Sequence, residues 1–262
     1  MDLGINRNKQ INATGNRPVK RFAFAFIFLS LPLYSPCTTN SASAYPTAES
    51  KKQTRLGHFL LMENKFRQAI PYYSRAIKIN PSDSQAWNER ATARRQCDDA
   101  QGALEDVNHA IAIDPQVASF FIEKSQIYSD LQKPTLAIEN VNKAIALSGK
   151  KIPYYMFEER ARLYEVIHEN DKALVDFSEA LRVGPKEAGC HYDRALLYFK
   201  KGRYQEAVND LTLAAARKDS ADHNRIYQLR AKCYEKLGKP DLAAKDMKQG
   251  NIGSLEEWGL TP

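Results

Sequence analysis

The sequence predicts an all-α protein, a solenoid of about six helix-turn-helix units. The first observation is a fixed period of 34 or 36 residues between the alanines Ala69, Ala103, Ala137, Ala173, Ala207 and Ala243. Small residues recur seven positions later, at Ala76, Ala110, Ala144, Ala180, Ala214 and Gly250. Five positions further on stand Pro81, Pro115, Gly149, Pro185 and Asp219, most of which stop helices. Self-similarity at a period of about 20 to 50 residues indicates a repeat architecture.

The repeats define a domain at 53–250. Its units lie near 50–83, 84–117, 118–151, 154–187, 188–221 and 224–250. A large residue stands sixteen positions before the first alanine in five of the six units, where it is Trp87, Phe121, Phe157, His191 or Tyr227; Gln53 is the exception. A tyrosine follows seven positions later in four units, at Tyr128, Tyr164, Tyr198 and Tyr234.

The fourth unit shows how each unit becomes two helices. Phe157, Ala161 and Tyr164 share one face of a first helix, because they follow the spacing i, i+4, i+7. Asn170 and Asp171 break this pattern and begin a second helix, whose inner face carries Ala173, Phe177, Ala180 and Leu181. Small residues are expected where the helix axes pack closely.

This pattern resembles the tetratricopeptide repeat, whose signature is W-x2-L-G-x2-Y, then A-x3-F, then P. The resemblance covers roughly residues 50–250, although the Leu-Gly pair occurs only as Leu56-Gly57. It implies antiparallel helix pairs stacked into a right-handed superhelix whose concave face binds peptides. Some members of the family hold C-terminal carboxylates with Lys, Asn and Arg side chains. The comparable positions here are Thr54, His58, Asn88 and Thr92, of which only Asn88 fits.

The N-terminus reads as an export signal at 1–44. Basic residues precede the apolar run 22–34, and Ala42-Ser43-Ala44 matches an A-x-A cleavage site. This order predicts a periplasmic or secreted protein that begins at Tyr45. Two alternatives remain: an uncleaved apolar anchor in the membrane, and a lipid-modified Cys37.

Two short segments flank the repeats. Residues 45–52 are expected to be a polar linker. Residues 251–262 contain Leu255, Trp258 and Leu260 and are expected to cap the last helix pair, since a terminal repeat must hide an apolar face.

Composition and motifs exclude several function classes. The net charge is +7, but residues 1–44 hold five basic residues and one acidic residue. The rest has 33 basic and 30 acidic residues, a balance of +3 that does not favour nucleic acid. No nucleotide, metal or nucleophile motif occurs, so we expect no enzyme, cofactor or metal site.

Paired substitutions between units predict structural ion pairs. An arginine of the first helix and an aspartate sixteen positions later occur together in four units: Arg90/Asp106, Arg160/Asp176, Arg194/Asp210 and Arg230/Asp246. The other two units change both members, to Lys124/Asn140 and Leu56/Tyr72. Residues that vary together are expected to be in contact.

The fifth unit carries the predicted peptide-binding patch. On each first helix, a stripe of residues lies beside the stripe that faces the core. This stripe is mostly polar in four other units, but in the fifth it consists of Tyr192, Leu196 and Phe199, which share one helix face. Arg162 and Lys232 flank the stripe, and Tyr155 extends it. An apolar centre with a polar rim is typical of a recognition surface. The alternative is that these side chains fill a tight contact between units.

Together these patterns predict a non-catalytic scaffold for a protein or peptide ligand outside the cytoplasm. The alternative is a membrane-tethered structural subunit of a cell-envelope assembly. A membrane is expected to be involved only through an uncleaved or lipidated N-terminus.

Overall fold

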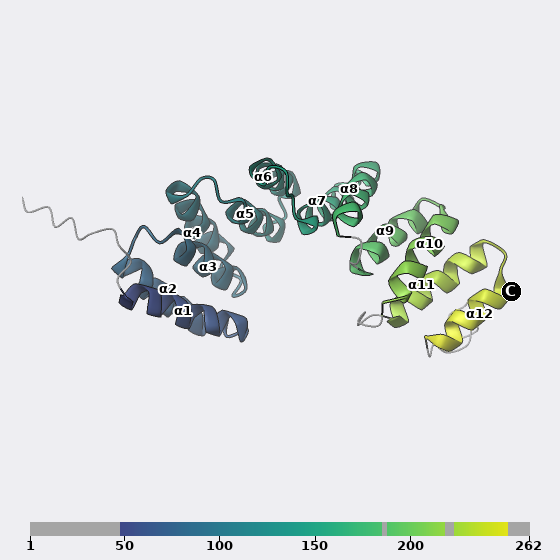
Figure 1. The fold of residues 1–262 in the computed structure, drawn as a ribbon, viewed down its shortest axis with the longest axis horizontal. Coiled ribbons are helices and arrows are strands. Elements are labelled where there is room, and N and C mark those ends of the chain that lie inside the picture. Colours follow the sequence, from purple (N-terminus) through teal and green to yellow (C-terminus); the bar gives the residue numbers. More distant parts are fainter. Residues whose placement is uncertain (1–47, 185–187, 218–222, 251–262) are drawn as a thin grey trace, which may run out of the picture. The chain divides into compact units, whose positions relative to one another are not determined.

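In a computed structural model, residues 48–184, 188–217 and 223–250 are described, and they form twelve α-helices (Figure 1). This confirms the predicted all-α fold of paired helices. In chain order the helices are α1 (Ala48–Met62), α2 (Phe66–Ile79), α3 (Ser84–Arg95), α4 (Ala100–Ile113), α5 (Ala118–Asp130), α6 (Pro134–Leu147), α7 (Tyr154–Val166), α8 (Asn170–Val183), α9 (Ala188–Lys200), α10 (Tyr204–Ala215), α11 (His223–Lys236) and α12 (Pro240–Gln249).

Consecutive helices pair into six units, from α1 with α2 to α11 with α12. The second helix of each unit packs against the first helix of the next unit. First helices of adjacent units also meet, as α1 does with α3, α3 with α5, and α9 with α11. Each unit is therefore stabilised mainly by its immediate neighbours, as in repeat proteins generally.

The recurring small residues lie where helices cross. Both alanine series are fully buried, including Ala69, Ala76, Ala173 and Ala180. A side chain without γ atoms lets two helix axes approach closely, and larger side chains then fill the space on either side. Around α8, for example, Phe157, Phe177 and Leu197 join one apolar cluster with Ala173 and Ala180.

The turn inside each unit has a common backbone geometry. Six residues at the same place in their units have a positive φ between 57° and 74°: Asn64, Asp98, Gln132, His168, Gly202 and Gly238. The residue that directly follows each of them donates its N–H back to the first helix, as Lys65 does to the Leu60 carbonyl at 2.8 Å. These residues have a left-handed backbone conformation and terminate the first helix. Only two of them are glycine, so the sequence pattern alone did not reveal this turn.

One predicted boundary was wrong. Helix α1 begins at Ala48, so residues 48–52 are helical and do not belong to a linker. In this first turn Ser50 is buried and donates to the Ala76 carbonyl at 3.3 Å, which joins the start of α1 to α2. The predicted signal at 1–44 and the predicted cap at 251–262 lie outside the described residues. Among the helices described, none has the length and apolar character needed to cross a membrane.

Candidate ligand groove

The structure brings together all four predicted arginine–aspartate pairs. In the fourth unit, Arg160 donates from Nε and Nη2 to the two carboxylate oxygens of Asp176, each at 2.7 Å. The other pairs have the same two-pronged geometry, with distances of 2.7 or 2.8 Å, in Arg90–Asp106, Arg194–Asp210 and Arg230–Asp246. The four aspartates are no more than 3% exposed. Each pair joins the two helices of its own unit.

Each of these arginines also reaches the preceding unit, which the sequence pattern did not indicate. The third nitrogen, Nη1, donates to a polar side chain on the second helix of that unit: Ser74, Asn142, Ser178 or Thr212, at 2.7 to 3.2 Å. The arginine therefore couples three helices. The signal that could have found it is the polar residue at the same place in successive second helices.

The apolar stripe of α9 is half-buried. Tyr192, Leu196 and Phe199 pack against a cluster formed by α9, α10 and α11, in which Leu211 and Ile226 are central. Phe199 also meets the ring of Tyr204 edge to face, with the centroids 5.5 Å apart. This placement favours the alternative interpretation, in which the stripe fills a contact between units.

The residues predicted to flank the stripe are spread over two helices. Arg162 on α7 donates to Asp193 at 2.9 Å and to Glu158 at 2.6 Å, so it joins α7 to α9. Tyr155 is exposed near the start of α7 and contacts the Tyr154 ring. Lys232 is exposed on α11. Arg162 and Tyr155 thus contact neighbours other than the stripe residues.

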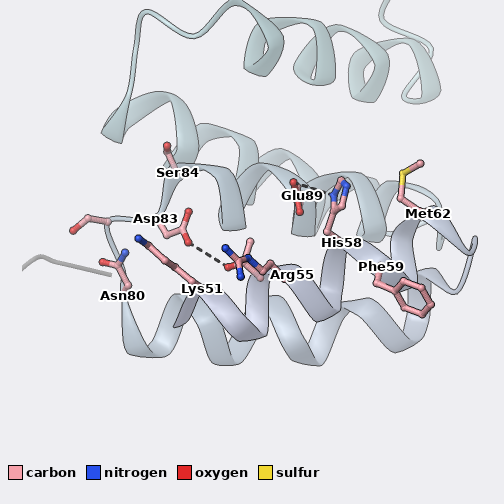
Figure 2. Close-up of a pocket in the computed structure, with 11 residues that line it drawn as sticks. Lys51, Arg55, His58, Phe59, Met62, Asn80, Asp83, Ser84 and Glu89 are labelled. Carbon is pink, nitrogen blue, oxygen red and sulfur yellow. Dashed lines mark hydrogen bonds and ion pairs between the residues drawn. The ribbon is translucent and has the colours of Figure 1, made fainter. Parts of the chain in front are cut away.

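A groove of about 820 Å³ lies instead in the first two units (Figure 2). Helix α1 forms one wall, and the link between α2 and α3 forms the other together with the first turns of α3. Its lining residues are Lys51, Thr54, Arg55, His58, Phe59, Met62, Asn80, Ser82, Asp83, Ser84 and Glu89.

The α1 wall changes character along its length. Lys51 and Arg55 lie toward the Asp83 end of the groove, and Phe59 and Met62 lie at the other end (Figure 2). Neither cation forms an ion pair with a residue that the structure describes. Phe59 and Met62 are 60% and 68% exposed, the largest values among the exposed apolar side chains of α1.

Both acidic groups of the opposite wall accept hydrogen bonds, although Glu89 Oε2 is buried without a hydrogen-bond partner. Asp83 accepts the Ala86 N–H at 3.0 Å, which caps α3, and it accepts the Thr54 hydroxyl at 3.3 Å. Glu89 accepts a hydrogen bond from Gln85 at 2.9 Å and lies 3.4 Å from His58 Nδ1. The cations of the lining, Lys51 and Arg55, therefore lie on the α1 wall, and its acids, Asp83 and Glu89, lie on the opposite wall.

Close packing behind α1 fixes the groove wall. Gly57 is buried against the Tyr73 ring of α2, and a Cβ atom at Gly57 would lie 2.7 Å from Tyr73 Cε1. Burial, together with the negative charge of Glu89, raises the pKa of Tyr73. The phenol therefore stays neutral, and its ring packs directly against α1 at Gly57.

Within the described ranges, other chemically reactive groups do not gather into a site. Among the described residues, no cluster of three His, Cys, Asp or Glu side chains could hold a metal ion. Cys190 and Cys233 are buried, and burial raises the pKa of each thiol to about 12. Both thiols are therefore protonated at neutral pH.

Comparisons with known proteins identify the repeats. Two family models described as tetratricopeptide repeat match residues 55–118, 159–223 and 192–249, and residues 118–151. The Hsp70-Hsp90 organizing protein of Triticum aestivum is 25% identical over 203 residues, which are 77% of this chain and 35% of that protein. The Hsp70-Hsp90 organizing protein 3 of Arabidopsis thaliana is 31% identical over 80 residues, which are 30% of this chain and 14% of that protein. The chain thus spans about a third or less of these two relatives.

Among solved structures, the type IV pilus biogenesis factor PilW has the same fold. It superposes with a TM-score of 0.69 and 19% identity, over 81% of this chain and 98% of PilW. At this identity the likeness concerns the fold alone. Since the repeat models match well over half of its residues, this chain belongs to the tetratricopeptide repeat family.

Proposed function

We propose that this chain is a non-catalytic scaffold that holds a segment of a partner protein against its first helices. The binding site is the groove between α1 and the start of α3. The observation that carries the proposal is the groove itself, because it combines about 820 Å³ of space with exposed apolar side chains and unpaired cations. Interfaces typically combine apolar anchors with polar groups that fix orientation.

The family supports the same function. Tetratricopeptide repeat domains typically serve as scaffolds, and the relatives from Triticum aestivum and Arabidopsis thaliana are named as organizing proteins. The groove lies on first helices, the side that the family resemblance assigns to peptide binding. Helices of adjacent units meet there, so a ligand can contact more than one unit.

Site-specific photo-crosslinking tests this proposal. A benzophenone amino acid replaces Phe59 in the groove, and in a matched control it replaces Val175, which is 63% exposed on α8. We expect discrete crosslinked partner proteins from position 59 in cells of the native host, and none of the same species from position 175. Equal crosslinking from both positions would show that the groove is not a preferred binding surface.

We also infer that the repeats act outside the cytoplasm. This inference is supported by the order of the basic segment, the apolar run 22–34 and the A-x-A site in the sequence. N-terminal sequencing of the protein from its native host should give Tyr45 as the first residue. An intact Met1 or a lipid-modified Cys37 would refute cleavage at Ala44.

A further inference from the structure

We propose that the partner segment at this groove is an amphipathic helix with acidic side chains opposite Lys51 and Arg55 and a bulky apolar side chain over Phe59. This inference rests on the proposed scaffold function and adds the chemistry of the partner. It depends on a comparison of the first unit with the other five at equivalent positions.

The exposure of Phe59 is the first observation. At the equivalent positions, the other first helices carry residues that are at most 3% exposed: Ala93, Ile127, Leu163, Leu197 and Cys233. The preceding unit covers this position; Ala93, for example, packs against Ala69 and Tyr73. Phe59 is 60% exposed because no described unit precedes α1. In the other five units the position equivalent to Phe59 is buried, so we expect an apolar helix face to cover Phe59 as well.

The charge at Arg55 is the second observation. Its equivalents in the next four units are all acidic: Glu89, Glu123, Glu159 and Asp193. Two of these acids meet a cation from the first helix of the preceding unit, in the pairs Arg95–Glu123 and Arg162–Asp193, and Glu89 lies 3.4 Å from His58 Nδ1. The first unit reverses the sign. An element that docks where a preceding unit would lie must therefore present an acid to Arg55.

Spacing along α1 defines the partner further. Lys51, Arg55 and Phe59 follow one another at intervals of four residues, about 6 Å along the helix axis. A partner helix packed alongside would match them with two acidic residues and one apolar residue, each one turn from the next. Met62 extends the apolar end of the same face.

Two other occupants fit the charges less well. The chain's own residues 1–44 carry five basic residues and one acid, so they would be repelled by Lys51 and Arg55. A terminal carboxylate would meet polar groups that are already engaged: Thr54 with Asp83, His58 with Glu89, and Thr92 with the Asn88 carbonyl.

The test measures binding of the full chain to synthetic helical peptides with blocked ends, by fluorescence anisotropy. One peptide carries two glutamates and a leucine at intervals of four residues, for a helix parallel to α1. A second peptide carries the same residues in reverse order, for a helix antiparallel to α1. We expect one of them to bind. Arg55→Glu should weaken binding about tenfold or more, since it replaces an attraction by a repulsion, and Phe59→Ser should weaken it similarly.

Matched controls separate binding from folding. Arg182→Glu and Val175→Ser change exposed residues of α8 and should leave the affinity unchanged. The thermal midpoint of each groove variant should stay near that of the parent, because Arg55 and Phe59 are exposed. A peptide with lysines in place of the glutamates should bind Arg55→Glu better than it binds the parent chain, which a merely structural role of Arg55 would not produce.

Several results would overturn the proposal. These are equal affinity of both groove variants and the parent, peptide binding that requires removal of residues 1–44, a dimer that dissociates in Phe59→Ser, and binding to anionic vesicles but not to either peptide. If crosslinking at position 59 still captures partner proteins in those cases, the scaffold function stands and only the acidic-helix chemistry fails.

Discussion

The third and fourth units carry different residues at the two positions of the ion pair. In the fourth unit, Arg160 donates two hydrogen bonds to Asp176 and a third to Asn142 of the preceding unit. The third unit has Lys124 and Asn140 there instead. Asn140 donates to the Leu136 carbonyl at 2.7 Å, and its buried Oδ1 has no hydrogen-bond partner. Burial, aided by the charge of Lys143, lowers the pKa of Lys124.

Both units nevertheless have the same helix pairing. Ala137 and Ala144 of the third unit are as fully buried as Ala173 and Ala180 of the fourth. The third unit thus forms from the alanine series and the apolar residues between them without the ion pair, and in the four units that have the pair its arginine also contacts the unit before. Buried pairs contribute little net stability compared with apolar packing, but losing one partner costs much more.

Removing one partner in the fourth unit should have the largest effect. Arg160→Met leaves Asp176 buried without its cation, and we expect a loss of about 3–5 kcal/mol in the free energy of unfolding. Urea denaturation measures it. The control is Arg182→Met, which breaks an exposed pair with Glu179 and should cost less than about 1 kcal/mol. Equal losses would mean that Asp176 is solvated well enough without Arg160.

Apolar contacts between units should be the next most costly to remove. Leu196→Ser combined with Phe199→Ser takes half-buried side chains out of the cluster with α10 and α11, at about 2–3 kcal/mol. Differential scanning calorimetry should show a lower midpoint. A variant with an unchanged midpoint that fails to bind partners would restore the stripe as a recognition surface.

These contacts show where sequence reasoning succeeds. The period, the alanine series and the joint change of Arg160 with Asp176 follow from packing and charge rules that every unit repeats, so six copies in one chain reveal them. The groove does not repeat. It arises because α1 has no described unit before it, so Phe59 is exposed although its position is buried elsewhere. A per-unit pattern averages out such an end effect, and it also misplaced the start of α1.

Installing the ion pair in the third unit should stabilise that unit. Lys124→Arg with Asn140→Asp recreates the two-pronged geometry, and Asn108 of the preceding unit stands where Asn142 accepts from Arg160. In a double-mutant cycle we expect a favourable coupling of about 1 kcal/mol or more. Asn140→Asp alone should destabilise the protein, because a buried carboxylate would face a lysine without matching geometry. Additive effects would show that the third unit's backbone cannot hold the pair.

The smallest effect is expected for Lys124→Met. Lys124 has no carboxylate partner at the position of Asp176, so removing its charge should change the free energy of unfolding by less than about 0.5 kcal/mol, against the large loss in Arg160→Met. The pH dependence gives an independent check. Because the folded pKa of Lys124 lies below its unfolded value, the unfolded chain binds more protons, and this group makes the protein more stable as the pH rises through the folded pKa. Denaturation at a series of alkaline pH values should show this gain in the parent chain and not in Lys124→Met. A large loss of stability in the variant at neutral pH would mean that the lysine, like Arg160, joins its unit to its neighbours.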